Sequence, residues 1–359
     1  MTEPRPWMIY GANGYTGRLI AKEAVRRGQR PILAGRDRAR VESLARELNL
    51  EFRAFDLNDA ARHLEDIAAV LHCAGPFSHT SAPMVRACLE SRAHYLDITG
   101  EIAVFEAIFR EHDEAIRAGV ALIPGVGFDV VPTDCLAAKL AAALPEATEL
   151  ALAFYARGST MSRGTLKTMI EGMPHGGAER RNGKIARIPA AHEVREIPFS
   201  CGTRTAVTIP WGDIATAFRT TGIPDIRVYS AAPRSVIRRL RLFRPMLGLL
   251  RFAPVRGLVQ HLATRRAGAS EAQRANARTW LWGEALSDRE RVSLTMETPD
   301  GYTLTAMTAV RAVERVLAGQ VDAGSWTPAR AFGSEFIEEF DGVTVHPMQQ
   351  RNRDVRPSR

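Results

Sequence analysis

Residues 7–28, WMIYGANGYTGRLIAKEAVRRG, decide the fold of the first part of the chain. The apolar run at 7–10 predicts a short buried strand, and a glycine-rich loop follows it at once. Beyond the loop, apolar residues recur at helical spacing from Leu19 to Val25, and Gly28 marks the end of that helix. A G-x-x-G-x-x-G string between a strand and a helix is the setting in which it binds a dinucleotide.

Each glycine of this loop has a separate physical task. Gly11 permits the tight turn, Gly14 lets the backbone approach a pyrophosphate, and Gly17 allows close packing of helix on strand. The start of the helix supplies N–H groups to the anion. An ordinary strand–helix turn is the alternative interpretation.

The end of the second expected strand, PILAGR at 31–36, bears on the choice of nucleotide. An NAD site places an acidic residue about 20 residues beyond the loop, to hold the ribose 2′-hydroxyl. Here Arg36 stands at that place, and a guanidinium suits the 2′-phosphate of NADP. We therefore predict NADP(H), with Asp37 as the residue that would favour NAD if the register moved by one.

Two further strand ends belong to the same crevice. Asp56 ends the third expected strand and is assigned to the adenine amino group, with a turn or helix cap as the alternative. The fourth strand ends in CAGPF at 73–77, whose small residues let a nicotinamide ribose lie against backbone. Phe77 either flanks that ring or belongs to the core.

Short apolar runs alternate with helical patterns through residue 130. This alternation predicts βαβ units, hence a Rossmann-type, doubly wound parallel sheet in an α/β domain at 1–130. The remaining expected strands of this domain lie at 68–75, 93–99 and 119–126.

The second half predicts another α/β domain at 131–301. Its strand-like segments are closely spaced, which favours a mixed or antiparallel sheet. A helix at 301–319 is expected to return to the nucleotide domain, with 302–359 as a crossover that ends in a disordered tail. The helix near Leu166 is expected to begin at a cap, Ser162 or Thr165, which either holds an anion or is an ordinary cap.

A basic helical insert at 233–267 stands out within the second domain. Nine arginines and no acidic residue lie between 234 and 266, and leucine, phenylalanine and methionine are interspersed among them. Pro245 and Pro254 divide the segment into short helices. Peripheral contact with a membrane or lipid is one interpretation, and a helical subdomain with snorkelling arginines is the other.

Composition and charge exclude several classes. The chain has 359 residues, 45% of them hydrophobic and 25% charged, which is typical of globular domains. Its net charge of +8 comes from the basic insert, and no nucleic-acid module is recognisable. The chain has no CxxC pair and no histidine cluster, so the sequence does not predict a metal site. Without a signal sequence or spanning segment, we expect a cytoplasmic protein, or one peripheral to the inner membrane surface; a homo-oligomer is compatible with this.

A family resemblance becomes specific once the motifs are taken together. The chain resembles the saccharopine dehydrogenase-like NADP-binding family in GANGYTG, AGRD, HCAGPF, HYLDITGE and PGVGFDVVPTD, in this order across about the first 135 residues. Further on, WLWGEA, TPDGYTLTA and GSWTPARAFG are similar to the bacterial branch that includes trans-acting enoyl reductases. About 165–275 match weakly.

The resemblance implies a Rossmann domain, a second α/β domain with substrate between the two, and pyridine-nucleotide redox chemistry. It also implies that Arg36 contacts the 2′-phosphate and that Ala74, Gly75 and Pro76 line the nicotinamide side. The phosphate loop it implies comprises Gly11, Asn13, Gly14, Tyr15, Thr16 and Gly17.

The catalytic signature is the weakest part of the sequence. No tyrosine in the chain is followed four residues later by a lysine, so the Tyr-x-x-x-Lys pair of short-chain dehydrogenases is absent. No HExxH or GxSxG motif occurs either. Tyr95 is the predicted proton donor, with buried structural hydrogen bonding as the alternative. Asp97, Glu101, Asp129 and His79 are the other candidates near the expected strand ends.

Three hypotheses of function follow. The first is an NADPH-dependent enoyl reductase acting on a hydrophobic acyl or lipid-linked substrate. The second is an imine reductase acting on an amino-acid substrate, which would need arginines for two carboxylates. The third is a non-catalytic NADP-binding sensor or scaffold, which turnover of NADPH would exclude.

Overall fold

The chain divides into two compact units, each with its own sheet. The computed structural model describes residues 5–158, 161–264 and 271–352. Unit 1 consists of Met1–Val131 and Tyr302–Gly333, and unit 2 of Pro132–Gly301 and Ser334–Arg359. Unit 1 is therefore discontinuous in sequence, since most of unit 2 is inserted within it.

Unit 1 contains a seven-stranded sheet in the order β15-β6-β5-β4-β1-β2-β3. Every neighbouring pair in it is parallel. The strand order reverses between β1 and β4, and ligands bind at such a switch point in open α/β sheets. The strands are β1 Trp7–Tyr10, β2 Ile32–Gly35, β3 Phe52–Ala54, β4 Ala69–His72, β5 His94–Asp97, β6 Ala121–Ile123 and β15 Gly324–Ser325.

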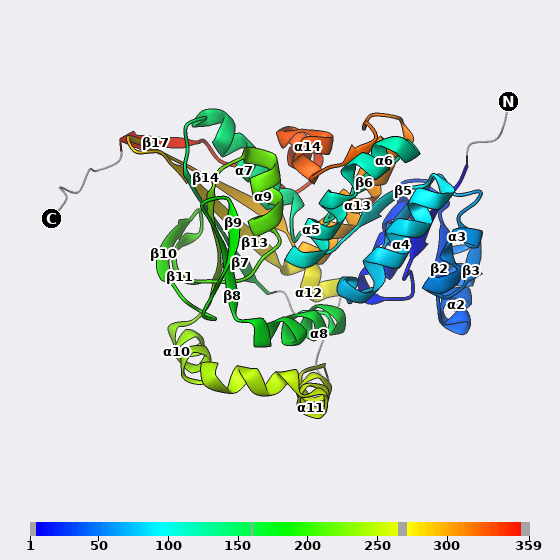
Figure 1. Ribbon diagram of the computed structural model, residues 1–359, viewed down its shortest axis with the longest axis horizontal. Helices are drawn as coiled ribbons and strands as arrows, with labels where there is room; N and C mark the ends of the chain where they lie inside the picture. The colour runs from blue at the N-terminus through cyan, green and yellow to red at the C-terminus, as the bar shows by residue number, and fades with distance from the viewer. Residues whose placement is uncertain (1–4, 159–160, 265–270, 353–359) are drawn as a thin grey trace. The chain divides into compact units, whose positions relative to one another are not determined.

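Helices cover both faces of this sheet because right-handed crossovers run in opposite directions from β1. Helices α4, α5 and α6 lie side by side on the near face in Figure 1. On α1, Arg27 pairs with Glu314 of α13 at 3.5 Å. The helices of unit 1 are α1 Tyr15–Arg26, α2 Arg38–Leu48, η1 Leu57–Asp59, α3 Ala60–His63, α4 Phe77–Ser91, α5 Ile102–Arg110, α6 His112–Ala118, α13 Gly301–Leu317 and α14 Pro328–Phe332.

The strands at the centre of this sheet are buried along their whole length. All four residues of β1, β2 and β4 are buried, as expected of parallel strands covered on both faces. Met8, Val70 and Leu122 are fully buried in one core cluster. The predicted doubly wound parallel sheet is confirmed.

Unit 2 contains a ten-stranded mixed sheet with the path β10-β11-β12-β7-β13-β14-β16. β12 and β7 are parallel, and the other neighbours on the path are antiparallel. This confirms the predicted second α/β domain. The strands are β7 Glu149–Arg157, β8 Gly177–Arg181, β9 Lys184–Ile188, β10 Val194–Phe199, β11 Gly202–Thr208, β12 Asp225–Ala231, β13 Arg278–Leu286, β14 Glu290–Pro299, β16 Thr344–Val345 and β17 Gln349–Asn352.

The helices of unit 2 include the basic insert. As predicted from the two prolines, this insert forms three short helices. Helix α7 packs on β13 so closely that a Cβ on Gly283 would lie 2.6 Å from Leu136 Cδ2. The helices are α7 Val131–Ala143, α8 Arg163–Gly172, η2 Met173–His175, α9 Asp213–Thr221, α10 Arg234–Leu242, η3 Arg244–Arg251, α11 Ala253–Thr264, α12 Glu271–Asn276 and η4 Ser334–Glu339.

The C-terminal segment differs from the expectation. Residues 302–333 belong to unit 1, but Ser334–Arg359 belongs to unit 2. Gln349–Asn352, expected in a disordered tail, forms β17 and pairs with β14, whose backbone groups satisfy those of the strand. The rest of that expected tail, 353–359, lies outside the described residues, as do 265–267 of the basic insert.

In the described part of the chain, every helix is too short or too polar to cross a membrane.

Candidate dinucleotide site

The glycine loop packs against the end of β4 with no room for side chains. Gly11 has a φ of +84° and a Cβ on it would lie 2.7 Å from the Ala74 backbone nitrogen. A Cβ on Gly17 would lie 2.4 Å from the Gly11 carbonyl oxygen. Turning and close packing are the two tasks predicted for these glycines, and the geometry requires glycine for both.

The start of α1 has features that favour a bound anion. Gly14 is its exposed N-cap residue and has no side chain with which to cap the helix, and the first turn holds no acidic residue. The positive end of the helix dipole therefore favours an anion at this end of α1. Gly14 has no side chain to keep a diphosphate at a distance, so the loop fits the pyrophosphate of a dinucleotide.

The other three loop residues surround this terminus. Asn13, Tyr15 and Thr16 are half-buried. The Asn13 Oδ1 lies 3.0 Å from the place of a Cβ on Gly35, so this side chain reaches the end of β2. The Tyr15 ring meets the Tyr302 ring of α13 edge-on, with centroids 5.0 Å apart.

Two charged residues lie where the adenosine half of a dinucleotide would bind. Arg36 follows β2, is exposed, and makes no ion pair with a described residue. Burial raises the pKa of Tyr10 to about 12, the charge of Asp56 adds to this, and the charge of Arg36 opposes it. Both charges are therefore close to the Tyr10 ring, at the carboxyl ends of β2 and β3.

The carboxylates of Asp37 and Asp56 both act as caps. Asp37 Oδ1 accepts a hydrogen bond from Arg40 N at 3.1 Å, at the start of α2. Asp56 Oδ1 accepts one from Asn58 N at 3.2 Å, at the start of η1. The ribose and adenine roles considered for these residues remain predictions.

On the side predicted to hold the nicotinamide, side-chain hydrogen bonds hold the Ala74-Gly75-Pro76 loop in place. Thr80 Oγ1 lies 2.6 Å from the Ala74 carbonyl oxygen and 3.1 Å from that of Pro76. Glu101 accepts hydrogen bonds from Phe77 N at 2.8 Å and Ser78 N at 3.1 Å, and so caps α4. Gly75 itself is exposed, which leaves its backbone open to a ligand.

His72 supports this loop as a neutral imidazole, through a hydrogen bond with Thr80. It is fully buried, and burial lowers its pKa to about 3. Its Nε2 lies 3.0 Å from Thr80 Oγ1. Because Thr80 has one hydroxyl proton, which the carbonyls accept, His72 Nε2 donates to Thr80. Sequence reasoning missed His72 and Thr80, although both stand in the HCAGPFSHT stretch that drew attention to Phe77.

Phe77 has a mixed environment. Its side chain is half-buried, packs against the core of unit 1, and meets His72 edge-on with centroids 5.5 Å apart. Its core contacts agree with one of the two interpretations, and contact with a nicotinamide ring stays a prediction.

Tyr95 lies in the core, away from solvent. Its side chain is 0% exposed and its hydroxyl donates to Asp97 Oδ2 at 2.7 Å. Burial and the Asp97 charge raise the pKa of Tyr95 well above its ordinary value. This geometry agrees with the buried structural hydrogen bond considered as the alternative, and proton donation by Tyr95 stays a prediction.

Asp97 ties β5 to the loop after β6. Its Oδ1 accepts hydrogen bonds from Gly125 N at 2.8 Å and Thr99 N at 2.9 Å. Burial raises the pKa of Asp97 to about 6, although these hydrogen bonds and that of Tyr95 act in the opposite direction. Asp97 therefore positions the loop that carries Asp129.

Asp129 lies at the same edge of the sheet, in the loop after β6. Its Oδ2 lies 2.9 Å from the place of a Cβ on Gly100, so it sits beside the chain leaving β5. Its side chain is half-buried, and burial raises its pKa to about 6. A carboxyl group with such a pKa can donate a proton near neutral pH.

The cap predicted near Leu166 is an ordinary one. Ser162 Oγ accepts a hydrogen bond from Thr165 N at 3.1 Å, which satisfies the first turn of α8. No separate anion site is needed to explain it.

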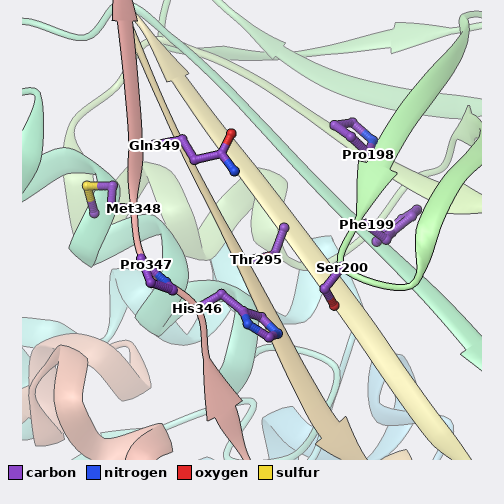
Figure 2. A pocket seen from close by; sticks show the side chains of 8 residues that line it. All are labelled: Pro198, Phe199, Ser200, Thr295, His346, Pro347, Met348 and Gln349. Carbon is purple, nitrogen blue, oxygen red and sulfur yellow. The ribbon is translucent and has the colours of Figure 1, made fainter.

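Unit 2 also holds an open pocket of about 480 Å³, shown in Figure 2. Near it, Ser200 Oγ donates to Glu297 Oε1 at 2.8 Å, and His346 Nε2 lies 3.5 Å from the same oxygen. None of the predicted site residues lines this pocket. Its lining residues are Pro198, Phe199, Ser200, Thr295, His346, Pro347, Met348 and Gln349.

A protein family described as the saccharopine dehydrogenase NADP binding domain matches residues 7–123. This part of the chain, about a third of its length, is similar to that family. The match covers every predicted cofactor residue of this chain, from Gly11 to Phe77, and identifies the sheet of unit 1 as an NAD(P)-binding domain.

Two curated relatives are similar over the same part of the chain. A saccharopine dehydrogenase-like oxidoreductase of Homo sapiens is 30% identical over 158 residues, which cover 37% of each chain. A trans-acting enoyl reductase of Mycobacterium tuberculosis is 33% identical over 138 residues, covering 35% of this chain and 33% of the relative. The similarity thus spans little more than a third of the length of these relatives.

The fold of the whole chain is similar to that of a solved structure. Apo saccharopine dehydrogenase (L-Glu forming) from Saccharomyces cerevisiae aligns over 97% of this chain and 100% of its own, with a TM-score of 0.66. The sequence identity is 12%, so this similarity concerns the fold alone.

Proposed function

We propose that this protein is an NADPH-dependent oxidoreductase that reduces a conjugated C=C bond in a hydrophobic acyl or lipid-linked substrate. The observation that carries the nucleotide part is the start of α1 behind the glycine loop, which has a glycine N-cap and no acidic residue in its first turn, together with Arg36 at the end of the neighbouring strand. The first binds a diphosphate and the second a 2′-phosphate.

Several residues would hold the nucleotide. Gly14 and the start of α1 bind the pyrophosphate, and Arg36 binds the 2′-phosphate. The Ala74–Pro76 backbone lies along the nicotinamide side, kept in position by Thr80 and Glu101. When bound, NADPH would supply the hydride for reduction of the C=C bond, and a side chain of this protein would supply the proton, so that NADP⁺ and a saturated acyl group would result.

In this proposal Asp129 supplies that proton. It combines partial exposure, a place at the carboxyl ends of β5 and β6, and a raised pKa of about 6. Asp129→Asn should lower kcat and leave NADPH affinity unchanged. In the wild type, kcat/KM should fall as the pH rises above about 6, because the acid loses its proton. An unchanged profile in Asp129→Asn would contradict the assignment.

The C=C reaction is favoured over imine reduction by the charges on unit 2. An amino-acid substrate with two carboxylates needs arginines that are not already neutralised. In a pocket of about 120 Å³ on the sheet, Arg195 pairs with Glu284 at 2.6 Å and Arg227 with Glu179 at 2.9 Å. The partial similarity to the mycobacterial trans-acting enoyl reductase supports the same choice.

The nucleotide part is tested by fluorescence titration of the full chain with NADPH and with NADH. Loss of a charged hydrogen bond in Arg36→Ala should weaken NADPH binding about tenfold or more and leave NADH binding unchanged. Arg86→Ala, at an exposed arginine of α4, is the matched control. Equal affinities for the two nucleotides in the wild type would contradict the NADP assignment.

The reaction is tested by following NADPH absorbance with two kinds of acceptor. We expect oxidation with a medium-chain 2-enoyl thioester and none with a 2-oxo acid mixed with an amino acid. The reverse result would favour the imine reductase. No turnover with either acceptor, in a protein that binds NADPH, would favour the sensor or scaffold.

A further inference from the structure

We propose that the basic-apolar segment of unit 2, residues 234–262, binds the surface of a bilayer that contains anionic phospholipid. This inference is independent of the dinucleotide site and of the reaction proposed above. It rests on exposed apolar side chains, on the way the segment is fastened to unit 2, and on its charge.

Large apolar side chains are exposed along the whole segment. Leu242 is 73% exposed, Phe252 64% and Leu258 61%. A soluble surface normally scatters such residues singly, and a contiguous group marks an interaction site. The exposed large apolar residues of the segment are Val236, Leu242, Phe243, Met246, Leu249, Phe252, Val255, Leu258 and Leu262.

Their spacing on α11 places them on one face. Val255, Leu258 and Leu262 stand at i, i+3 and i+7, which is one stripe of an α-helix. In Figure 1, α10 and α11 belong to one run of consecutive helices (yellow-green). The exposed side chains of α11 therefore form an apolar stripe that no described helix or strand of the chain buries.

The segment is fastened to the rest of unit 2 by its other side. Ile237 of α10 is 3% exposed and packs with Ala191 and Val207. Arg241 Nε and Arg244 Nη2 each donate to the Ala191 carbonyl oxygen at 2.9 Å. Because α10 has one face packed and anchored, its exposed Leu242 lies on the other side of the helix.

Cations surround the apolar side chains. Seven arginines and no acidic residue lie at 234–262. Arg238, Arg239, Arg251 and Arg256 make no ion pair with a described residue. On α10, Arg238 and Arg239 flank Leu242 within the exposed arc of the helix. A basic helix with exposed leucine and phenylalanine lies in the plane of an anionic interface.

The positive charge of the segment distinguishes between the partners that could cover its apolar side chains. A second copy of this segment would bring the same positive charges face to face, which opposes self-association. A nucleic acid would use the arginines and leave the nine apolar side chains in water. An anionic bilayer matches both features, and the contact is peripheral because these helices are too short to span it.

The experiment is co-sedimentation of the full chain with vesicles of equal parts phosphatidylglycerol and phosphatidylcholine, and with phosphatidylcholine alone. We expect binding to the anionic vesicles alone, weakened by salt. Leu258→Glu/Leu262→Glu should abolish it. Arg238→Gln/Arg239→Gln should weaken it roughly tenfold or more, at about 1 kcal/mol for each charge.

Two matched variants in unit 1 serve as controls. Ile116→Glu changes an apolar side chain that is 50% exposed on α6, and Arg110→Gln changes an exposed arginine of α5. Both should bind like the wild type, and all variants should keep its thermal unfolding midpoint. No binding to anionic vesicles, binding that the segment variants do not reduce, or a concentration-dependent dimer that Leu258→Glu/Leu262→Glu dissolves would overturn the proposal.

Discussion

At the scale of single residues, two of the loop glycines, Gly17 and Gly14, should respond differently to a methyl group. A Cβ at position 17 would lie 2.4 Å from a backbone oxygen of the same loop, which cannot move far. Gly17→Ala should therefore lower the free energy of unfolding by roughly 1–3 kcal/mol. At position 14 the corresponding distance is 3.2 Å, so Gly14→Ala should fold normally and lose NADPH affinity.

Thermal unfolding and nucleotide titration of the same samples separate the two effects. Gly119→Ala is a control for backbone strain, since Gly119 has a φ of +72° and no atom near its missing Cβ. It should lower stability by about 1 kcal/mol and leave nucleotide binding intact. Normal NADPH binding by Gly14→Ala would show that the diphosphate does not approach that residue.

Asp97 should make stability depend on pH. Its pKa is about 6 in the folded protein and near 4 when unfolded, so the folded state holds this proton more tightly. The free energy of unfolding should therefore fall as the pH rises from about 4 to about 6. Asp97→Asn removes this titration, so the stability of the wild type relative to the variant should be greatest at low pH. Parallel pH profiles in urea unfolding would refute this.

At the scale of elements, two neighbouring residues at the start of α2 have different predicted roles. The Asp37 carboxylate is structural, and the Arg36 guanidinium is proposed to bind the nucleotide. Asp37 caps α2, whereas the neighbouring Arg36 has no ion-pair partner among the described residues. Asp37→Ala should cost about 1 kcal/mol of stability and leave the NADPH-to-NADH preference unchanged. A shift in that preference, measured by titration, would instead place Asp37 on the ribose.

Elements of unit 1 were predictable because local and global signals agree there. Buried parallel strands appear as short apolar runs, and glycines mark the loop and the helix ends, so β1 to β6 follow from the sequence. In unit 2 the β8–β9 hairpin was missed, although Asn182 and Gly183 are a turn signal, with φ of 49° and 74°. Its strands GAERR and KIARI carry too many charges to show a clear alternation.

The part of the site that could be predicted is the part whose function depends on the backbone conformation rather than on contacts between side chains. The glycine loop follows from residue type and spacing alone. The network of His72, Thr80 and Glu101 depends on which side chains meet across β4, α4 and the loop after β5, which spacing does not reveal. Likewise, alternation along β5 put Tyr95 and Asp97 on one face but could not show that this face is fully buried.

At the scale of the whole molecule, nucleotide binding should stabilise two parts of unit 1 that lie far apart in the sequence. Tyr302–Gly333 completes unit 1, where Thr305 Oγ1 accepts from Phe128 N at 2.9 Å and Thr308 Oγ1 donates to the Val126 carbonyl at 2.8 Å. Saturating NADPH should slow amide hydrogen exchange in 7–131 and in 302–333. Protection confined to 7–131 would contradict this coupling.

The inserted position of unit 2 has a consequence during synthesis of the chain. The parallel sheet receives its last strand, β15, and its helix α13 only after the whole of Pro132–Gly301 has been made. At ribosomal speed this interval lasts roughly 10–30 s. During it, the edge of β6 and the surface later covered by α13 are open to other chains. The nascent nucleotide domain should therefore need shielding by chaperones until its C-terminal piece emerges.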